Sequence, residues 1–166
     1  LISSPEKHVR DILSLAIGYS EKQAVVVVSD ARCPLAITLT DAYRRCLPKA
    51  QHIDFDSVSP EEVLAAFKPL VPSDLVVLIQ STSFRLEAFR IRVELFNRSL
   101  KVIEHPHLSR MPGVEAQYYV DSLAYDSEYY RGIGHALKGR IDRAHSGRVD
   151  SGGERLDFAS GFEPAK

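Results

Sequence analysis

The chain has 166 residues, of which 45% are hydrophobic and 26% charged, and a formal net charge of −1. This balance is typical of a globular protein with one well-buried core. The near-zero charge argues against a nucleic-acid partner, because such proteins carry a strongly basic face or domain. No apolar run approaches the roughly 18 residues that cross a bilayer, and no signal peptide opens the sequence, so no membrane partner is expected.

The cysteines and the two ends of the chain indicate where the protein works and how much of it is present. Cys33 and Cys46 form no Cys-x-x-Cys pair, and their spacing matches no zinc module, so we expect reduced thiols in a cytoplasmic protein. The chain begins at Leu1 and stops in "RLDFASGFEPAK", where Leu156 and Phe158 alternate as in a strand whose partner has not been supplied. We therefore expect part of the protein to be missing from this chain.

Helical and strand patterns alternate along the first two thirds of the sequence. "SSPEKHVRDILSLAIGYS" opens with an amphipathic helix, and "AVVVVS", at 24–29, is typical of a strand buried on both faces of a parallel sheet. The pattern then predicts a helix at 34–47, a strand at 52–55, a helix at 59–70, a strand at 74–80, a helix at 86–97 and a strand at 100–104. Ser59 is placed to cap the 59–70 helix.

This order predicts an α/β fold in which residues 1–145 form one domain. The expected architecture is a Rossmann-like three-layer sandwich with a mainly parallel sheet of about four to five strands. A later helix, capped by Asp126, carries an apolar stripe that we expect to be buried: Tyr130, Ile133, Leu137, Ile141 and Ala144. Gly132, Gly134 and Gly139 in that helix suggest close approach of another backbone. Residues 146–166 are expected to be the start of a second, truncated β-rich segment.

Polar side chains follow the predicted strands at their carboxyl ends, the edge where open α/β sheets bind ligands. These residues are the ligand-binding candidates: Asp30, Arg32, Ser81, Ser83, Arg85, His105 and His107. In "VIEHPHL", an extended chain would project His105 and His107 to one side and Glu104 to the other. Two histidines completed by a carboxylate from another strand could hold a metal, and loop anchoring or a ligand contact is the alternative. We predict loop or pocket residues and no metal ligand.

Other chemistries lack their sequence signatures. "QSTSFR" contains no Gly-x-Ser-x-Gly elbow, and the Gly-Ile-Gly at 132–134 lies inside a predicted helix, where it cannot cradle a phosphate. Cys33 precedes a helix but has no neighbouring histidine to act as its base, so we interpret it as an idle or buried thiol. No catalytic residue is predicted. The tyrosines between 118 and 130 favour an interdomain or dimer interface over a ligand pocket.

Three stretches, "VIEHPHLSRM", "YYVDSLAYDSEYYRGIGHALKGRID" and "DSGGERLDF", follow one another in an order that resembles the N-terminal half of thermophilic-type leucyl aminopeptidases. These are the aminopeptidase T-like metallopeptidases, and the related dihydroxypyridine dioxygenases share their architecture. The resemblance implies an α/β domain that packs against a C-terminal domain supplying glutamate, histidine and aspartate metal ligands. It implies a divalent metal in the full-length protein, no cofactor in this chain, and no catalytic residue at any position here.

The expected function is therefore an N-terminal scaffold and substrate-pocket domain of an aminopeptidase-like metalloenzyme whose metal-binding half is absent from this chain. Its expected partners are that missing catalytic domain and a second copy of the chain in a homodimer. The alternative is a stand-alone, non-catalytic module that binds a small anionic ligand. Its binding residues would be Asp30, Arg32, Ser81, Ser83, Arg85 and His107.

Overall fold

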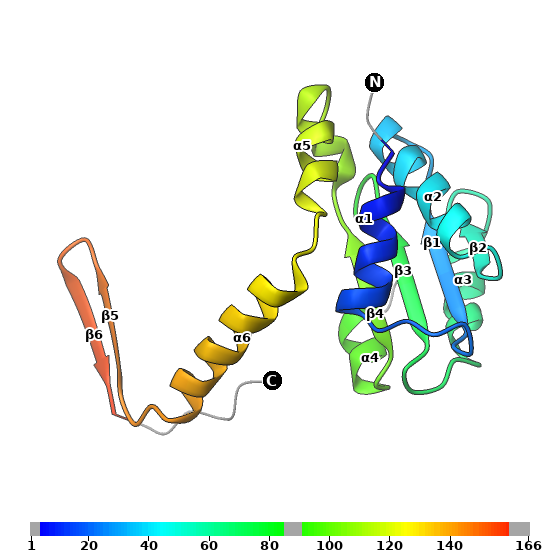
Figure 1. Cartoon of the computed structure of the whole chain (residues 1–166). Helices are drawn as coiled ribbons and strands as arrows, with labels where there is room; N and C mark the ends of the chain where they lie inside the picture. Colours follow the sequence, from blue (N-terminus) through cyan, green and yellow to red (C-terminus); the bar gives the residue numbers. More distant parts are fainter. Residues whose placement is uncertain (1–3, 85–90, 160–166) are drawn as a thin grey trace. The chain divides into compact units, whose positions relative to one another are not determined.

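The computed structural model describes residues 4–84 and 91–159, and the chain divides into two compact units, Leu1–Tyr125 and Asp126–Lys166. Figure 1 labels the elements of both. This division begins the second unit with a helix that the sequence analysis had placed in the first domain. The predicted domain boundary between residues 145 and 146 stays a prediction.

The first unit alternates helices and strands as the sequence predicts. Its strands are β1 (Val25–Ser29), β2 (Gln51–Asp54), β3 (Leu75–Ile79) and β4 (Lys101–His105). Its helices are α1 (Glu6–Asp11), the π-helical turn η1 (Ile12–Ala16), α2 (Pro34–Cys46), α3 (Pro60–Phe67), α4 (Ile91–Asn97), the 3₁₀ turn η2 (Leu108–Arg110) and α5 (Val114–Ser122). Of the helix predicted at 86–97, residues 86–90 lie outside the described residues.

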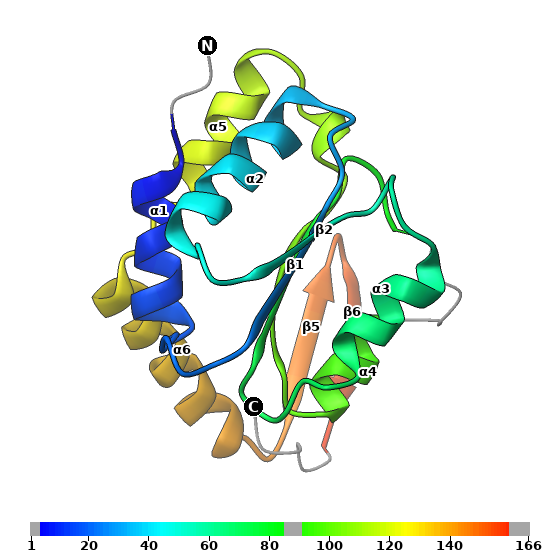
Figure 2. The ribbon, with the colours of Figure 1, turned by 90° about the vertical axis from the view of Figure 1, so that its right-hand side faces the viewer.

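The four strands form one parallel sheet in the order β2-β1-β3-β4. The two central strands are buried along their whole length, as their β-branched and aliphatic sequences require of strands covered on both faces. Figure 2 shows α1, α2 and α5 on one side of the sheet and α3 and α4 on the other. The predicted Rossmann-like α/β sandwich with a parallel sheet is therefore confirmed.

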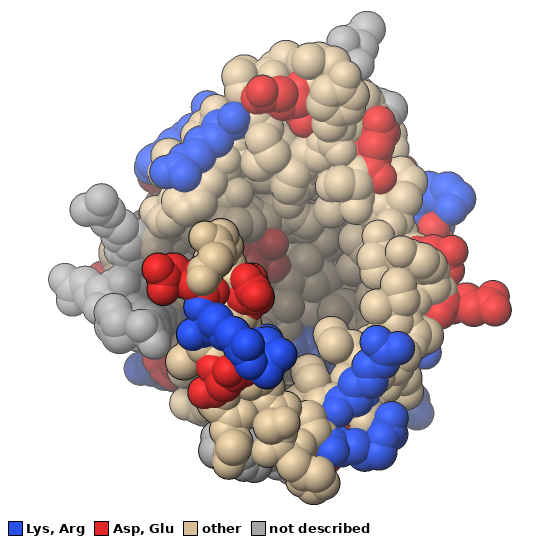
Figure 3. Space-filling model, turned by 90° about the vertical axis from the view of Figure 1, so that its left-hand side faces the viewer, with Lys and Arg blue, Asp and Glu red and all other residues tan. Residues whose placement is uncertain are grey.

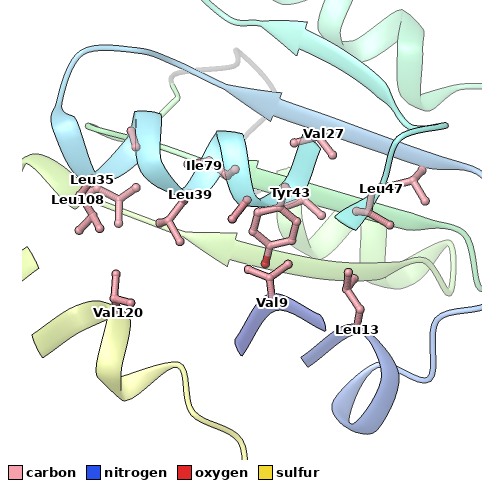
Figure 4. Close-up of a cluster of buried hydrophobic side chains, with 14 of the residues drawn as sticks. Val9, Leu13, Val27, Leu35, Leu39, Tyr43, Leu47, Ile79, Leu108 and Val120 are labelled. Carbon is pink, nitrogen blue, oxygen red and sulfur yellow. The ribbon is translucent and has the colours of Figure 1, made fainter. Parts of the chain in front are cut away.

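Alternate residues of the central strands feed two separate cores. Val27, Val77 and Ile79 pack with α1, α2 and α5, whereas Val26, Val28 and Leu78 pack with α3 and α4. Figure 4 shows the first core, where Leu35, Leu39 and Tyr43 of α2 lie among side chains from the neighbouring helices and strands. Tyr43 is fully buried there, which places a phenol hydroxyl in an apolar environment and requires a hydrogen-bond partner for it.

The start of α3 follows the predicted local chemistry. The Ser59 hydroxyl accepts a hydrogen bond from the Glu62 backbone N–H, and the Glu62 side chain accepts one from the Ser59 N–H. This capping box and Pro60 in the first turn satisfy donors that a helix start otherwise leaves unpaired. The prediction that Ser59 caps this helix is confirmed.

The second unit contains α6 (Ser127–Asp142), β5 (Gly147–Ser151) and β6 (Glu154–Phe158). The Asp126 side chain accepts a hydrogen bond from the Tyr129 N–H at 3.0 Å, as predicted for a cap. The prediction that the segment after residue 146 leads into β structure is confirmed, but the prediction that its last strand lacks a partner is wrong. β5 and β6 form an antiparallel hairpin whose turn residues, Gly152 and Gly153, both have positive φ, as a type I′ turn requires.

Two predictions about α6 find no support within the second unit. There, none of its residues is buried, and Ile133 and Leu137 are 50% and 55% exposed. A methyl group added at Gly132 or Gly134 would meet no described atom of this unit within 4 Å outside the helix's own backbone. The apolar periodicity correctly indicated a helix, but periodicity alone does not supply the surface that buries a stripe.

Two further features of the described residues are the distribution of surface charge and the length of the apolar helices. On the face drawn in Figure 3, basic and acidic side chains both occur and much of the surface is uncharged. Among the described residues, no helix is long and apolar enough to span a membrane.

Amide hydrogen exchange should separate the hairpin from the sheet. We expect Val149–Phe158 to exchange much faster than Val25–Val28, because an exposed two-stranded hairpin is marginally stable in water, whereas β1 is buried and paired on both sides. The measurement is made on a demonstrated monomer, with Val25–Val28 as the internal reference. Equal protection of the two segments would contradict this expectation.

Candidate functional site

The carboxyl ends of the neighbouring strands β1 and β3 lie side by side at the topological switch point of the sheet. The chain leaves β1 for β2 on one side and returns to β3 on the other, which is where open α/β folds place their ligands. Asp30 follows β1 and is 3% exposed, and Ser81 follows β3 and is 1% exposed. One carboxylate oxygen of Asp30 accepts the Ser81 N–H at 2.9 Å, and the other accepts the Ser81 hydroxyl at 2.5 Å.

Ser81 also holds the loop that follows β4. Its carbonyl oxygen accepts both the backbone N–H of Ser109, at 3.1 Å, and the Ser109 hydroxyl, at 2.7 Å. Immediately before it, the Gln80 carbonyl accepts the Leu108 N–H at 3.0 Å. The backbone N–H, the hydroxyl and the carbonyl of Ser81 are therefore all hydrogen-bonded, and they join β1, β3 and the 108–109 turn.

A cavity of about 500 Å³ lies beside this junction. Its walls come from the first turns of α2, from η2 and from the start of α5. The apolar part of the lining consists of Pro34, Leu35, Leu108, Met111, Pro112 and Ala116. The polar side chains of the lining are Cys33, Thr38 and Ser109, and none of the described residues that line the cavity carries a formal charge.

The hydroxyls that face this region are engaged with the protein. Thr38 Oγ1 donates to the Pro34 carbonyl at 2.9 Å within α2, and Ser109 Oγ donates to Ser81. Each hydroxyl has one hydrogen, so these two side chains offer a bound molecule only lone pairs. Cys33 is different, because its sulfur lies 3.1 Å from the Ser81 Oγ and its side chain is half-buried at the edge of the cavity.

His105, the last residue of β4, lies behind the cavity wall in the core, where it is 2% exposed. Its Nε2 is 2.9 Å from the Tyr43 hydroxyl of α2, and its Nδ1 is 2.7 Å from the Tyr119 hydroxyl of α5. Burial lowers the pKa of His105 to about 4 and raises the pKa of Tyr119 to about 12. All three rings are therefore neutral near pH 7.

The burial of Tyr43 determines which nitrogen of His105 carries the hydrogen. Tyr43 is fully buried, and among the described residues its hydroxyl has only His105 as a hydrogen-bond partner. Tyr43 must donate to Nε2, since otherwise its own hydrogen would be buried without an acceptor. His105 then donates from Nδ1 to Tyr119, which is less buried and can direct its hydrogen elsewhere. The chain of hydrogen bonds runs from Tyr43 through His105 to Tyr119.

The 102–108 segment is not extended beyond His105, so the two histidines do not project to one side as an extended chain would place them. β4 ends at His105, and after Pro106 the chain turns so that His107 adopts a left-handed conformation with φ of 56°. The His107 Nε2 lies 3.2 Å from the Ser83 hydroxyl, away from the tyrosine pair of His105. Glu104 faces the other layer, where it accepts hydrogen bonds from Gln80 and Arg92.

The six candidate residues that the structure describes form separate groups instead of one site. Asp30 and Ser81 form the junction, Ser83 and His107 form an outer pair, and His105 lies in the core. Arg32 is exposed and makes a bidentate ion pair with Asp56, so its charge is already balanced. Arg85 lies outside the described residues. Among those residues, no three His, Cys, Asp or Glu side chains are grouped to hold a metal ion.

Some residues of this region were missed by sequence reasoning. Tyr43 lies one helical turn after Leu39 on the buried face of α2, so its need for a buried partner could have been inferred from the sequence. Tyr119 was interpreted only as part of an interface. The cavity itself could not be inferred from the sequence. It forms because the chain turns at His107 and brings Leu108 and Met111 against α2, and no local sequence signal predicts that turn.

The protonation of His105 should make stability fall on acidification. The folded state holds the imidazole neutral down to about pH 4, whereas the unfolded chain takes up the proton near 6.5. This contribution to the free energy of unfolding is complete above pH 6.5 and is lost as the pH falls from 6.5 to 4, by about 3 kcal/mol in total. Urea titrations of wild type and His105→Gln at several pH values measure it. Curves of equal pH dependence for the two proteins would refute the assignment.

No protein-family model, curated protein or solved structure matches this chain.

Proposed function

We propose that the first unit is a non-catalytic, substrate-pocket domain of an aminopeptidase-like metalloenzyme. The observation that carries the proposal is the uncharged cavity beside the Asp30–Ser81 junction. Its volume of about 500 Å³ is in the range of small-molecule sites, roughly 300–1,000 Å³. Its position at the carboxyl edge of the sheet is where α/β folds place ligands.

The lining selects a neutral, mainly apolar group. A carboxylate or phosphate in the cavity would lose its hydration, and no cationic side chain lines the wall to replace it. An aliphatic group would instead gain contacts with the exposed or partly exposed apolar side chains of the lining, Pro34, Met111 and Pro112. The proposed occupant is therefore the apolar part of a substrate, such as a leucine-like side chain.

The polar residues around the cavity support a positioning role. The Asp30 carboxylate, the three polar groups of Ser81 and both nitrogens of His105 are occupied by contacts within the unit. Groups committed in this way hold the walls in place, and none of them is a free nucleophile or metal ligand for peptide hydrolysis. Catalysis in the proposed enzyme would therefore come from residues elsewhere.

The metal-binding half and the cellular location belong to the same proposal. The three-part sequence resemblance to thermophilic-type leucyl aminopeptidases supports metal ligands in a part of the protein outside these 166 residues. Cys33 and Cys46 are both free thiols, which supports the proposed cytoplasmic location.

Ligand binding by the 166-residue chain tests the pocket. N-acetyl-leucinamide, which is neutral, should shift the amide NMR signals of Leu35, Leu108 and Ala116, whereas inorganic phosphate should not. Thr38→Phe should abolish these shifts by filling the cavity. Ile37→Phe is the matched control, because Ile37 is the neighbouring residue of α2, is 45% exposed and does not line this cavity. Phosphate shifts around Ser83 and His107 without leucinamide shifts would instead favour the small-anion module.

Activity of the chain tests where catalysis resides. We expect no turnover of leucine p-nitroanilide by the purified 166-residue chain with added Mn²⁺, Co²⁺ or Zn²⁺, because the proposed metal ligands lie outside it. A thermal melt shows that the assayed protein is folded. Metal-dependent turnover that EDTA removes would contradict the proposal and would place the catalytic centre within these residues.

A further inference from the structure

The two thiols of the chain lie at opposite ends of α2. Cys33 is the residue before the helix, and it lines the cavity. Cys46 is the last residue of the same helix, and its sulfur lies 3.7 Å from the Glu6 carbonyl. Both side chains are half-buried, and burial raises the pKa of the Cys46 thiol. The described residues therefore contain one thiol at the cavity and a second thiol away from it, which serves as the internal reference.

Cys33 is the end of a hydrogen-bond chain that leads to a carboxylate. The Ser81 Oγ lies 2.5 Å from Asp30 Oδ1 and 3.1 Å from the Cys33 sulfur. A serine hydroxyl has one hydrogen to donate, and the carboxylate is the stronger acceptor. The Ser81 hydrogen therefore goes to Asp30, and the Cys33 S–H is left to donate to the Ser81 oxygen. The order is thiol, hydroxyl, carboxylate.

The chain provides a route for the thiol proton at the wall of a cavity. When the sulfur attacks an electrophile, its proton can move to Ser81 Oγ while the Ser81 proton moves to Asp30. Asp30 is held for this by the Ser81 N–H at 2.9 Å and the Arg32 N–H at 3.3 Å. Among the described residues, Cys46 has no such hydroxyl and carboxylate. Its sulfur lies 3.7 Å from the Glu6 backbone carbonyl, and burial raises the pKa of its thiol against the opposing effect of Arg10 and Arg45.

We propose that the cavity is a thiol-modification site. Its ligand is a small, uncharged, mainly apolar molecule with an electrophilic carbon, of the α,β-unsaturated carbonyl class, and Cys33 is the residue modified. This inference rests on the proposed function, because it requires the cavity to bind neutral apolar groups. It goes further by assigning a covalent reaction to a named side chain.

The reaction is an addition in which atoms and electrons balance. A C–S bond forms between Cys33 and the β-carbon of the unsaturated carbonyl compound, and the C=C π bond breaks. Its electron pair moves toward the carbonyl, and the α-carbon then takes up one proton from water. The thiol proton passes through Ser81 to Asp30 and returns to solvent. No oxidant, reductant or leaving group is needed.

Alkylation of the folded chain by N-ethylmaleimide tests the proposal, with Cys33 and Cys46 followed separately by peptide mass spectrometry. We expect Cys33 to react faster, by about 10-fold or more, and its rate to saturate with reagent concentration because binding precedes reaction. N-ethylsuccinimide, the saturated analogue, should slow Cys33 and leave Cys46 unchanged. Saturation and protection at Cys33 alone would support the site.

Two substitutions separate the contributions of the cavity and of the hydrogen-bond chain. Thr38→Phe should remove saturation and slow Cys33, whereas Ile37→Phe should not. Ser81→Ala should slow Cys33 at saturating reagent, since it removes the proton acceptor. The concentration for half-saturation should stay unchanged, because the backbone of residue 81 keeps its bonds to Asp30 and Ser109 and so keeps the cavity walls in place. Amide NMR spectra establish that each variant is folded, and the Cys46 rate is the control within each sample.

The possible failures can be distinguished. Equal rates at Cys33 and Cys46, while N-acetyl-leucinamide still shifts the cavity signals, would overturn the modification site and leave the proposed function standing. A faster Cys33 without saturation, without succinimide protection and without an effect of Thr38→Phe would overturn the modification site, because the reaction would then not pass through a bound state. Loss of the N-acetyl-leucinamide shifts would overturn the proposed function as well. An unchanged saturated rate in Ser81→Ala would refute the proton route.

Discussion

The site depends on a single serine that is hydrogen-bonded in three directions. Ser81 is 1% exposed, so each of its polar groups needs a partner within the protein. Asp30 accepts its N–H and hydroxyl, and Ser109 donates twice to its carbonyl. These bonds fix the end of β1 and the turn after β4 relative to β3. Because α2 follows β1 and η2 follows β4, they also set the positions of two walls of the cavity.

The buried Tyr43–His105–Tyr119 chain fixes the third wall. It connects α2, the end of β4 and α5 through bonds of 2.9 and 2.7 Å, and burial keeps its imidazole neutral near pH 7. A charged histidine at this place would oppose the apolar character of the adjoining core. The Ser81 hydrogen bonds position the cavity walls at the edge of the sheet. The Tyr43–His105–Tyr119 chain positions α2 and α5 and adds no charge to the core beside the cavity.

The sequence was sufficient for the elements whose signals are local. β1 and β3 follow from continuous aliphatic runs, and the start of α3 follows from Ser59 and Pro60. The hairpin at Gly152 and Gly153 also had a local signal, and it was missed because the last strand was considered without the residues before it. The junction of Asp30 with Ser81 could not be predicted in detail, because the sheet brings together residues that are far apart in the chain.

The central claim is that a neutral apolar group occupies the cavity between the start of α2, η2 and the start of α5. Intermolecular nuclear Overhauser effects test it most directly, with N-acetyl-leucinamide bound to the chain carrying ¹³C-labelled Leu and Met methyl groups. The account predicts contacts from the ligand's isobutyl group to the methyl group of Met111, which lines the cavity and is partly exposed. Contacts confined to other methyl groups, or none at a concentration that saturates the amide shifts, would contradict it.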